Sequence, residues 1–521
     1  MEIRNPILPG FNPDPSICRV GDDYYIATST FEWFPGVQIH HSRDLVHWRL
    51  LTRVLNRVSQ LDMRGDPDSG GIWAPCLTHH EGTFYLCYTD VKNFIGIWKD
   101  THNYLVTAED IMGPWTDPIY LNASGFDPSL FHDDDGKSYL VNMIVDHRKG
   151  KNRFGGTLLQ EYSREEKRLI GPVRNIFPGT SLGCTEGPHI YKRNGFYYLM
   201  LAEGGTGYKH AVTIARSRSI TGPYEVHPHN PILTSANDAG VTLQKAGHAS
   251  LVETQNGEWY IAHLASRPIT EKKRCVLGRE TSLQKVVWKD DWLSLHTGGN
   301  APESAVPAPD IVSHPFPAEP VRDDFDDSTI PLCFQSLRVP MTEDWITLTA
   351  RKGYLRLYGR ESLASNHRQS LLARRQQAFS YTAATCLEFD PVSFQQMAGL
   401  ICYYDTDRFF YLHVSHDEDI GRHIAVISRD YDVFEETAER VPLGTARVFL
   451  KADVDHERLQ FSYSFDGSKW HSIGPVLDAS KLSDDYSRTW GFTGAFVGIC
   501  CQDLSGVRCH ADFDWFEYTE R

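Results

Sequence analysis

The sequence predicts an all-β protein in which a five-bladed β-propeller precedes a β-sandwich. The first observation behind this prediction is a short sequence motif, called the phrase below, that is rich in aromatic residues. It recurs five times in the first half of the chain. The second is that no amphipathic helical period of about a dozen residues competes with the strand patterns. The third is a stretch rich in Pro, Gly and Ala after residue 293, beyond which the phrase stops and a different strand pattern begins.

Each copy of the phrase reads as two strands joined by a tight turn. The turns contain Asn-Gly, Asp-Gly or a similar pair, which supplies the positive φ angles that short hairpins need. Successive copies are about 60 residues apart, which leaves room for roughly four short strands in each unit. Five such units predict five blades. The copies begin at Asp14, Ala74, Asp127, Gly187 and His248.

The repeat also predicts which side chains meet. The first strand of each propeller blade lines the central channel, so equivalent positions of the five copies converge on one axis. Asp14 and Asp127 start their copies, and Glu186 directly precedes the start of another. Alone, an Asp-Pro pair is usually a turn and a single Glu is usually a surface charge. Three carboxylates on one axis, flanked by apolar residues, instead indicate a functional site.

The remaining chain divides in two. We expect the propeller to occupy residues 1–300 and a linker to occupy residues 301–321, because this stretch is rich in Pro and Ala and has little periodicity. From residue 322 to residue 521, alternating apolar residues and regular turns predict a β-sandwich.

Composition excludes several classes of function. The net charge of −15 makes nucleic acid an unlikely partner. No apolar run reaches the roughly 18 residues of a membrane span, so we expect no membrane contact. The N-terminal residues lack the basic and apolar regions of a secretory signal, which predicts a cytoplasmic protein. The 11 cysteines include no Cys-x-x-Cys pair and are expected to be reduced thiols.

Three acids around one pocket suggest hydrolysis of a glycosidic bond. One carboxylic acid must protonate the leaving oxygen, and one carboxylate must take a proton from the attacking water. The third can orient the acid and raise its pKa through its own negative charge. The residues alone name this trio but do not assign the three roles.

Six long stretches resemble the β-xylosidases of glycoside hydrolase family 43. The stretches are NPILPGFNPDPSICRVGDDYYIATSTFEWFPGVQIHHSRDL, GGIWAPCLTHHEGTFYL, FDPSLFHDDDGKSYL, TEGPHIYK, LGRETSLQKVVW and FTGAFVGICCQDLSG. The resemblance implies that the sandwich is concanavalin-like and closes the active site. It also implies an exo-acting, inverting enzyme that releases D-xylose from the non-reducing end of β-1,4-xylo-oligosaccharides, with side activity on α-L-arabinofuranosides. The alternatives are an enzyme that is mainly an α-L-arabinofuranosidase, or a sugar-binding propeller without catalysis.

The resemblance assigns the catalytic roles. It implies that Asp14 is the general base, Asp127 the orienting and pKa-raising carboxylate, and Glu186 the general acid. An inverting enzyme needs space for water between base and acid, so these carboxyl groups should lie about 6.5–9.5 Å apart.

Further residues are expected to bind the substrate. Arg279 can fork onto sugar hydroxyls or hold a carboxylate. Trp73 shares its repeat position with Glu186, so it either stacks on a sugar or packs in the propeller core. The aromatic residue that reaches in from the sandwich is expected to be Phe496, although a core position is a close alternative. The full predicted set is Phe31, Trp73, Thr206, His248, Arg279 and Phe496.

We expect no required cofactor. Family members can place calcium or another divalent cation near the propeller axis, and His248 would then contribute indirectly, but a lone histidine more often only forms hydrogen bonds. The acidic run at His132 coincides with a hairpin turn and lacks the Glu of a calcium loop. The expected partners are a xylo-oligosaccharide substrate and further copies of the chain, in a dimer or tetramer.

Overall fold

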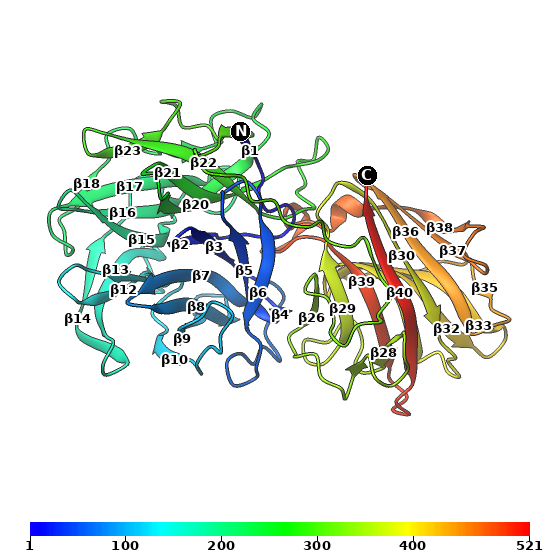
Figure 1. Cartoon of the computed structure of the whole chain (residues 1–521). Helices are drawn as coiled ribbons and strands as arrows, with labels where there is room; N and C mark the ends of the chain where they lie inside the picture. The colour runs from blue at the N-terminus through cyan, green and yellow to red at the C-terminus, as the bar shows by residue number, and fades with distance from the viewer.

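Five small antiparallel sheets form the N-terminal lobe of the computed structural model, which describes all residues from 1 to 521. Figure 1 shows these sheets arranged as the blades of a propeller, next to a second lobe of two larger sheets. The predicted all-β class and the two-part architecture are confirmed.

The strands of each blade follow one another outward from the axis, so each blade is a meander. Blade one contains β2 (Ser16–Val20), β3 (Asp23–Thr28), β5 (Gly36–Ser42) and β6 (Arg49–Leu55), and blade two contains β7 (Gly71–His80), β8 (Thr83–Asn93), β9 (Asp100–Ala108) and β10 (Ile119–Asn122). Blade three contains β11 (Ser129–His132), β12 (Ser138–Val145), β13 (Phe154–Ser163) and β14 (Arg168–Phe177). Blade four contains β15 (Glu186–Arg193), β16 (Phe196–Glu203), β17 (Ala211–Ser217), β18 (Glu225–Val226) and β19 (Leu233–Thr234), and blade five contains β20 (Gln244–Glu253), β21 (Trp259–Ser266), β22 (Glu280–Lys289) and β23 (Trp292–Leu295).

The ring of blades is held by apolar residues that lie between neighbouring sheets. Five separate buried clusters occupy the five junctions between blades, including the one between blade five and blade one. At that last junction, the Ile17 amide donates to Ser250 Oγ at 2.9 Å. The short pair β1 (Glu2–Arg4) and β24 (Ala305–Pro307) packs there as well, through Ile3 and Val306. Burial of these faces fixes the innermost strands around the axis.

The five repeat turns differ in length. Hairpins are present at all five predicted turns, and two-residue connections occur at Gly21-Asp22, Glu81-Gly82 and Asn194-Gly195. In blades three and five the predicted turns, Asp135-Gly136 and Asn256-Gly257, lie within longer connections of five residues, 133–137 and 254–258. In both, the glycine has positive φ and donates its amide to a carbonyl three residues earlier, as longer hairpin loops commonly do.

Two large sheets pack face to face in the C-terminal lobe, around one buried cluster of 38 residues. One sheet contains β25 (Arg322–Asp323), β27 (Ile346–Thr347), β28 (Leu355–Tyr358), β30 (Ser380–Glu388), β36 (Arg447–Asp455), β37 (Arg458–Ser464), β38 (His471–Asp478) and β40 (His510–Glu520). The other contains β26 (Phe334–Leu337), β29 (Ser370–Arg375), β31 (Gln396–Asp405), β32 (Arg408–Asp417), β33 (Gly421–Asp430), β34 (Val433–Glu436), β35 (Val441–Pro442) and β39 (Phe496–Asp503).

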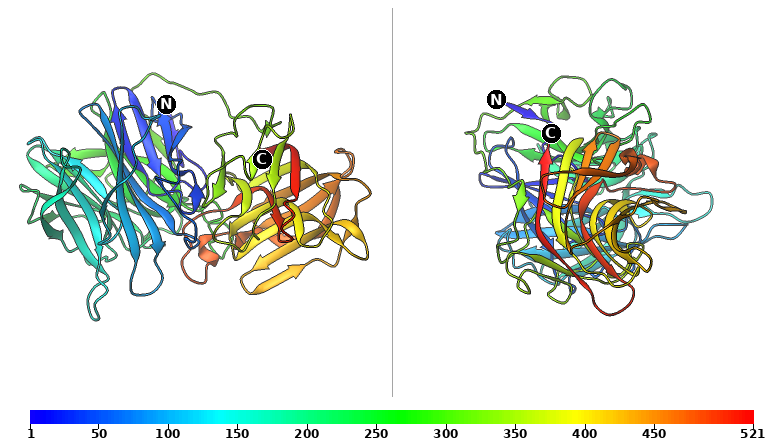
Figure 2. Two further views of the ribbon diagram at one scale, coloured as in Figure 1. Left: turned by 90° about the horizontal axis from the view of Figure 1, so that it is seen from below. Right: turned by 90° about the vertical axis from the view of Figure 1, so that its right-hand side faces the viewer.

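The two lobes share a sheet. The short strand β4 (Trp33–Phe34), which belongs to the propeller sequence, pairs with β26 at the edge of a sandwich sheet. The Arg338 amide extends this pairing by donating to the Glu32 carbonyl at 2.9 Å. The chain between the lobes runs along the outside of the molecule (Figure 2). Its first part, at β24, pairs with β1 and is therefore docked on the propeller.

Helical structure is confined to two short 3₁₀ turns, η1 (Ala479–Lys481) and η2 (Asp484–Tyr486). No helix of this structure has the length and the apolar character needed to cross a membrane. All 11 cysteines are free thiols.

Candidate active site

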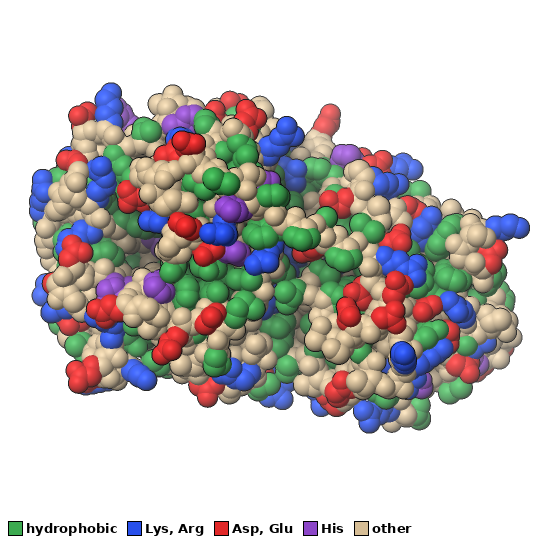
Figure 3. All heavy atoms as spheres, viewed as in Figure 1, with side chains coloured by type: hydrophobic (Ala, Val, Ile, Leu, Met, Phe, Trp, Pro, Cys, Tyr) green, Lys and Arg blue, Asp and Glu red, His purple; other side chains and the backbone are tan.

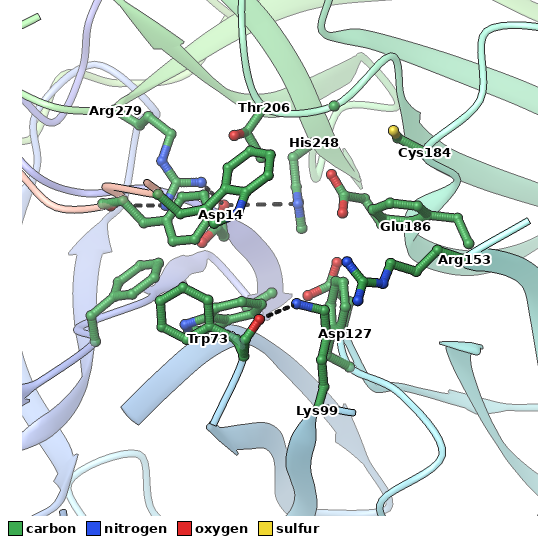
Figure 4. A pocket seen from close by; sticks show the side chains of 18 residues that line it. Asp14, Trp73, Lys99, Asp127, Arg153, Cys184, Glu186, Thr206, His248 and Arg279 are labelled. Carbon is green, nitrogen blue, oxygen red and sulfur yellow. Dashed lines mark hydrogen bonds and ion pairs between the residues drawn. The ribbon is translucent and has the colours of Figure 1, made fainter. Parts of the chain in front are cut away.

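The three predicted carboxylates meet at one end of the propeller axis. Asp14 and Asp127 lie just before β2 and β11, and Glu186 is the first residue of β15. These side chains are 5–8% exposed, and all three line the same pocket. In Figure 4 their carboxyl groups point into a common space. The structure therefore brings together residues that are far apart in the sequence.

The repeated phrase positions these groups through its backbone. Four of the five copies begin with a residue in the left-handed region, with φ of 55° at Asp14, 55° at Asp127, 57° at Gly187 and 47° at His248. This conformation is costly for residues other than glycine, and such strain is typical of functional sites. At Gly187 a Cβ atom would also lie 3.0 Å from the His248 ring. The close approach to His248 and the positive φ together explain why the fourth copy begins with glycine.

Asp14 is held in its ionised form. Its Oδ1 accepts a hydrogen bond from Arg279 Nη1 at 2.9 Å, and its Oδ2 accepts one from Ser29 Oγ at 2.7 Å. His248 Nδ1 lies 3.8 Å from Oδ1. Burial alone would raise the pKa of Asp14, but Arg279, His248 and the Ser29 hydroxyl outweigh it and lower that pKa. A carboxylate that stays ionised can accept a proton from water.

Asp127 and Glu186 are shifted in the opposite direction. Burial and the nearby Asp14 charge raise the pKa of Asp127 to about 8, although its Oδ2 accepts the Gly187 amide at 2.9 Å. Burial, followed by the charges of Asp127 and Asp14, raises the pKa of Glu186 well above its usual value. This direction favours the protonated form of Glu186, which can donate a proton. One pocket thus holds an ionised carboxylate and a carboxylic acid, the pair that acid–base hydrolysis requires.

The pocket that these acids line is small and largely aromatic. Its volume is about 170 Å³, below the roughly 300–1,000 Å³ of sites that enclose drug-sized ligands. The structure places five of the six residues predicted to bind substrate on its wall, and their contacts with a sugar stay predictions. These five are Phe31, Trp73, Thr206, His248 and Arg279.

The prediction for Phe496 is wrong. Phe496 is fully buried in β39, where its ring stacks on Trp33 with centroids 3.7 Å apart, and it does not line the pocket. The residue that reaches in from the sandwich is Phe492, four positions earlier, in the loop before β39. Its ring packs against Phe31 and Trp73, with centroids 6.0 and 5.4 Å away. Residues of a strand alternate between two packed faces here, whereas the preceding loop is free to extend over the propeller.

Hydrogen bonds from the propeller fix Phe492 at its backbone. Its amide donates to Ser69 Oγ at 3.1 Å, and its carbonyl accepts from Arg279 Nη2 at 2.9 Å. The same arginine therefore holds both Asp14 and the loop that closes the pocket. Earlier in the same segment, Asp485 of η2 accepts from Lys245 Nζ at 2.6 Å and from the Cys275 amide at 2.9 Å. The sandwich loop is thus anchored on the propeller at two places.

Sequence reasoning missed several residues of the pocket wall. Phe126 shares the repeat position of Trp73 and Glu186, a signal that identifies it. Phe154 begins β13, and the others lie in connections between strands of the propeller or in the sandwich loop before β39. No repeated position marks any of them. These missed residues are Phe94, Lys99, Phe126, Arg153, Phe154, Cys184, Trp490 and Phe492.

A cation near the axis remains a prediction from the family resemblance. No group of three or more His, Cys, Asp or Glu side chains is arranged to hold a metal ion. The nearest carboxylate to His248 is Asp14, which already pairs with Arg279. The protein groups at this place do not form a closed metal site, and no step below involves a metal.

Comparison with known proteins identifies the two parts of the chain. The pattern of glycosyl hydrolases family 43 matches residues 3–293, and that of the β-xylosidase C-terminal concanavalin A-like domain matches residues 322–519. The chain belongs to glycosyl hydrolase family 43. This is an inverting family, in agreement with the pairing of an ionised and a protonated carboxyl group in the pocket.

Individual family 43 relatives match over their full length. The chain is 52% identical to "Xylosidase/arabinosidase 43B" of Humicola insolens, covering 99% of this chain and 97% of that protein. It is 48% identical to "Xylan 1,3-beta-xylosidase" of a Vibrio species, covering 99% of both. The crystal structure of a xylan β-1,4-xylosidase from Bacillus halodurans superposes with a TM-score of 0.98 at 56% identity, covering 99% of this chain and 100% of that one.

Proposed function

We propose that this family 43 enzyme is an exo-acting β-xylosidase that releases D-xylose from the non-reducing end of β-1,4-xylo-oligosaccharides. The observation that carries the proposal is that one pocket holds Asp14, paired with Arg279 at 2.9 Å, together with Glu186. Arg279 lowers the pKa of Asp14, whereas burial raises the pKa of Glu186. The names of the full-length relatives support xylose as the sugar.

Membership of an inverting family supports a single displacement. Glu186 donates its proton to the glycosidic oxygen, and the bond between this oxygen and the anomeric carbon breaks. A water molecule attacks the same carbon from the opposite face and gives a proton to Asp14. Burial, with the neighbouring Asp127 and Asp14, favours the protonated form of Glu186, and the Gly187 amide fixes the position of Asp127. The products are α-xylose and an oligosaccharide shortened by one residue.

The closed shape of the pocket supports exo cleavage. Phe492 and the largely exposed Trp490 come from the sandwich and stack on each other with centroids 6.1 Å apart. They limit one side of the small pocket, so that one terminal sugar enters and the rest of the chain stays outside. Arg153 and Lys99 lie at the pocket beside Asp127 and Glu186, near the bond to be cleaved (Figure 4).

α-L-Arabinofuranosidase activity is the second candidate, and the relative from Humicola insolens favours it because its name joins both activities. Initial rates on 4-nitrophenyl β-xyloside and 4-nitrophenyl α-L-arabinofuranoside measure this preference. We expect a higher kcat/KM on the xyloside; the opposite ratio would make arabinofuranosides the principal substrates.

The preferred linkage is a separate question, because the Vibrio relative is named for the β-1,3 linkage. Rates on β-1,4- and β-1,3-xylobiose separate the two linkages, and we expect the β-1,4 compound to be faster.

The stereochemistry of the first product tests the mechanism directly. Proton NMR of xylobiose hydrolysis should show α-xylose before mutarotation equilibrates the anomers. An initial β-anomer would exclude the proposed displacement. Binding of xylobiose with no hydrolysis would instead support the non-catalytic, sugar-binding alternative.

The cellular setting follows from the thiols and the surface. Eleven free cysteines suit a reducing compartment, so we propose that the enzyme acts in the cytoplasm on short oligomers derived from xylan.

Exposed Val433 and Phe434 lie on β34, at the edge of a sandwich sheet. This edge supports the proposed assembly into a dimer or tetramer. Analytical ultracentrifugation should show a mass above the 59.2 kDa of one chain.

A further inference from the structure

A second cavity, separate from the active site, lies where the propeller, the linker and the sandwich meet. Its volume is about 450 Å³. The propeller contributes His40 of β5 and Arg53 of β6, the linker contributes residues 316–319, and the sandwich contributes Arg375 at the end of β29. Figure 3 shows histidine and basic side chains close together on the propeller next to the boundary between the lobes.

Two buried arginines in this cavity have no acidic partner. Arg53 and Arg375 are each 6% exposed. Arg53 donates to Gln38 Oε1 from Nε at 3.1 Å and from Nη2 at 2.8 Å, and to the Phe334 carbonyl at 3.2 Å. Arg375 donates to the Phe11 carbonyl at 2.6 Å and to Gln335 Oε1, while its Nη2 has no partner. Every partner is neutral, and neither arginine forms an ion pair with a carboxylate.

Three other buried arginines of the chain pair with carboxylates. Arg279 pairs with Asp14 at 2.9 Å, Arg338 with Asp68 at 2.7 Å, and Arg408 with Asp405 at 2.5 Å. Burial of a charge without a counter-ion costs several kcal/mol, so proteins normally pair such groups. Arg53 and Arg375 lack such a partner, and together they leave a charge of about +2 in one cavity.

The other ionisable groups around this cavity do not compensate that charge. Burial and the charges of Arg375 and Arg53 lower the pKa of His40 to about 3, so His40 is neutral. Its Nδ1 is buried and has no partner. Arg49 adds a further positive charge, above the ring of Phe316. Glu319 at the exposed rim is the one acidic residue of the lining, and it forms no ion pair.

His47, Cys333 and the neighbouring Arg374 complete this inventory. His47 is already paired with Asp44 at 2.7 Å. Burial raises the pKa of the Cys333 thiol, so this residue stays neutral. Arg374 is next to Arg375, lies over the Tyr518 ring and donates to Gln377. None of these groups supplies a free negative charge.

We propose that this cavity binds a small dianionic oxyanion, of which phosphate and sulfate are the simplest examples. Guanidinium groups recognise such anions with paired N–H donors, and two of them neutralise two negative charges. The volume leaves space for the anion and several water molecules. Because Arg53 belongs to the propeller and Arg375 to the sandwich, the bound anion connects the two lobes.

The anion would lie one aromatic layer behind the active site. The Arg375 guanidinium is 5.2 Å from the centroid of the Phe11 ring. Phe11 in turn packs against Phe31, a wall residue of the catalytic pocket, with ring centroids 5.7 Å apart. Binding therefore adds rigidity to the interface that supports the pocket, and it stabilises the folded chain by mass action.

Calorimetric titration of the full chain with inorganic phosphate, at constant ionic strength set by sodium chloride, tests the proposal. We expect one phosphate per chain and a matching rise of the melting temperature. Sulfate should behave similarly, and acetate, a monoanion, should bind at least tenfold more weakly. Acetate binding as tight as that of phosphate, or no saturable binding of phosphate and sulfate, would overturn the proposal.

Three variants locate the site. Arg375→Met should weaken phosphate binding at least tenfold, whereas Arg148→Met, which removes an exposed arginine elsewhere on the propeller, should leave it unchanged. Glu319→Gln should tighten binding about two- to fivefold, because it removes the negative charge at the rim. This exposed substitution keeps the test decisive even where Arg375→Met fails to fold. Unchanged affinity in Glu319→Gln, or wild-type affinity in a folded Arg375→Met, contradicts the assignment.

Discussion

The propeller and the sandwich bury their residues in different ways. The propeller divides most of its apolar interior among five clusters between blades, and its axis holds buried charged groups beside an aromatic cluster shared with the sandwich. The sandwich concentrates 38 buried residues in one continuous cluster. A ring of blades can therefore keep strained and unfavourably charged residues at its centre, because the surrounding clusters supply the stability. The sandwich has no such centre, and it contributes to the site through a loop at its edge.

The largest expected effect concerns the chemistry at the propeller axis. Glu186→Gln and Asp14→Asn should each lower kcat/KM on xylobiose by about 10²–10⁴-fold, the usual contribution of a general acid or base. Glu186→Gln removes no apolar contact and no ion pair, so its melting temperature should stay close to that of the wild type. Asp14→Asn leaves the buried Arg279 without its counter-ion and should also lower the melting temperature. Steady-state kinetics and thermal unfolding measure both quantities. Near-wild-type turnover by either variant would refute the assigned role.

The next effect should appear only in the stability of the sandwich. Phe461 is fully buried in the sandwich cluster, and Phe461→Ala should lower the free energy of unfolding by about 3–5 kcal/mol. Phe394 is 58% exposed, so Phe394→Ala is the matched control and should change stability by less than about 0.5 kcal/mol. Denaturant unfolding measures both. The kcat of the folded Phe461→Ala enzyme should be unchanged, and a large loss would show that the two lobes do not divide their roles as described.

A smaller effect tests the contribution of the sandwich to the pocket. Phe492→Ala should raise KM for xylobiose by about 10–100-fold, because one wall of the pocket loses an aromatic side chain worth about 1.5–3 kcal/mol of burial. The matched change Phe496→Ala removes the same group from behind the pocket and should mainly lower the melting temperature. Kinetics and thermal unfolding of both variants separate the two residues. The reverse pattern would restore Phe496 as the residue that reaches the substrate.

The smallest effect concerns stability at the axis. The folded pKa of Asp127 is raised to about 8 by burial and the Asp14 charge, so its contribution to stability is complete below pH about 4 and is lost as pH rises through 8. Asp127→Asn removes this loss. The variant should therefore gain stability relative to the wild type by about 1.4 kcal/mol for each pH unit between about pH 5 and pH 8, and the difference should level off above pH 8. Thermal unfolding across this range measures the difference, and a constant difference would contradict the raised pKa.

Sequence patterns predicted the features that the repeat determines. The blade count and the meeting of Asp14, Asp127 and Glu186 follow from one phrase and its spacing. Features set by contacts between distant segments were not predictable. Phe492 rather than Phe496 lines the pocket because of where β39 begins, and the sequence does not mark that position. The pairing of β4 with β26 involves two short segments about 300 residues apart. The unpaired Arg53 and Arg375 carry no motif, because their significance lies in the absence of a neighbouring acid.

The pairing of β4 with β26 limits how this chain can be divided. Each lobe, taken alone, would present the unpaired backbone of its short strand to water, and the aromatic residues Phe11, Trp33 and Phe496 would lose their shared packing. Exposed strand edges beside apolar surface promote aggregation. The catalytic propeller is consequently a poor candidate for transfer as an independent cassette into fusion proteins. Recombination between family members should preserve both partners of this junction together.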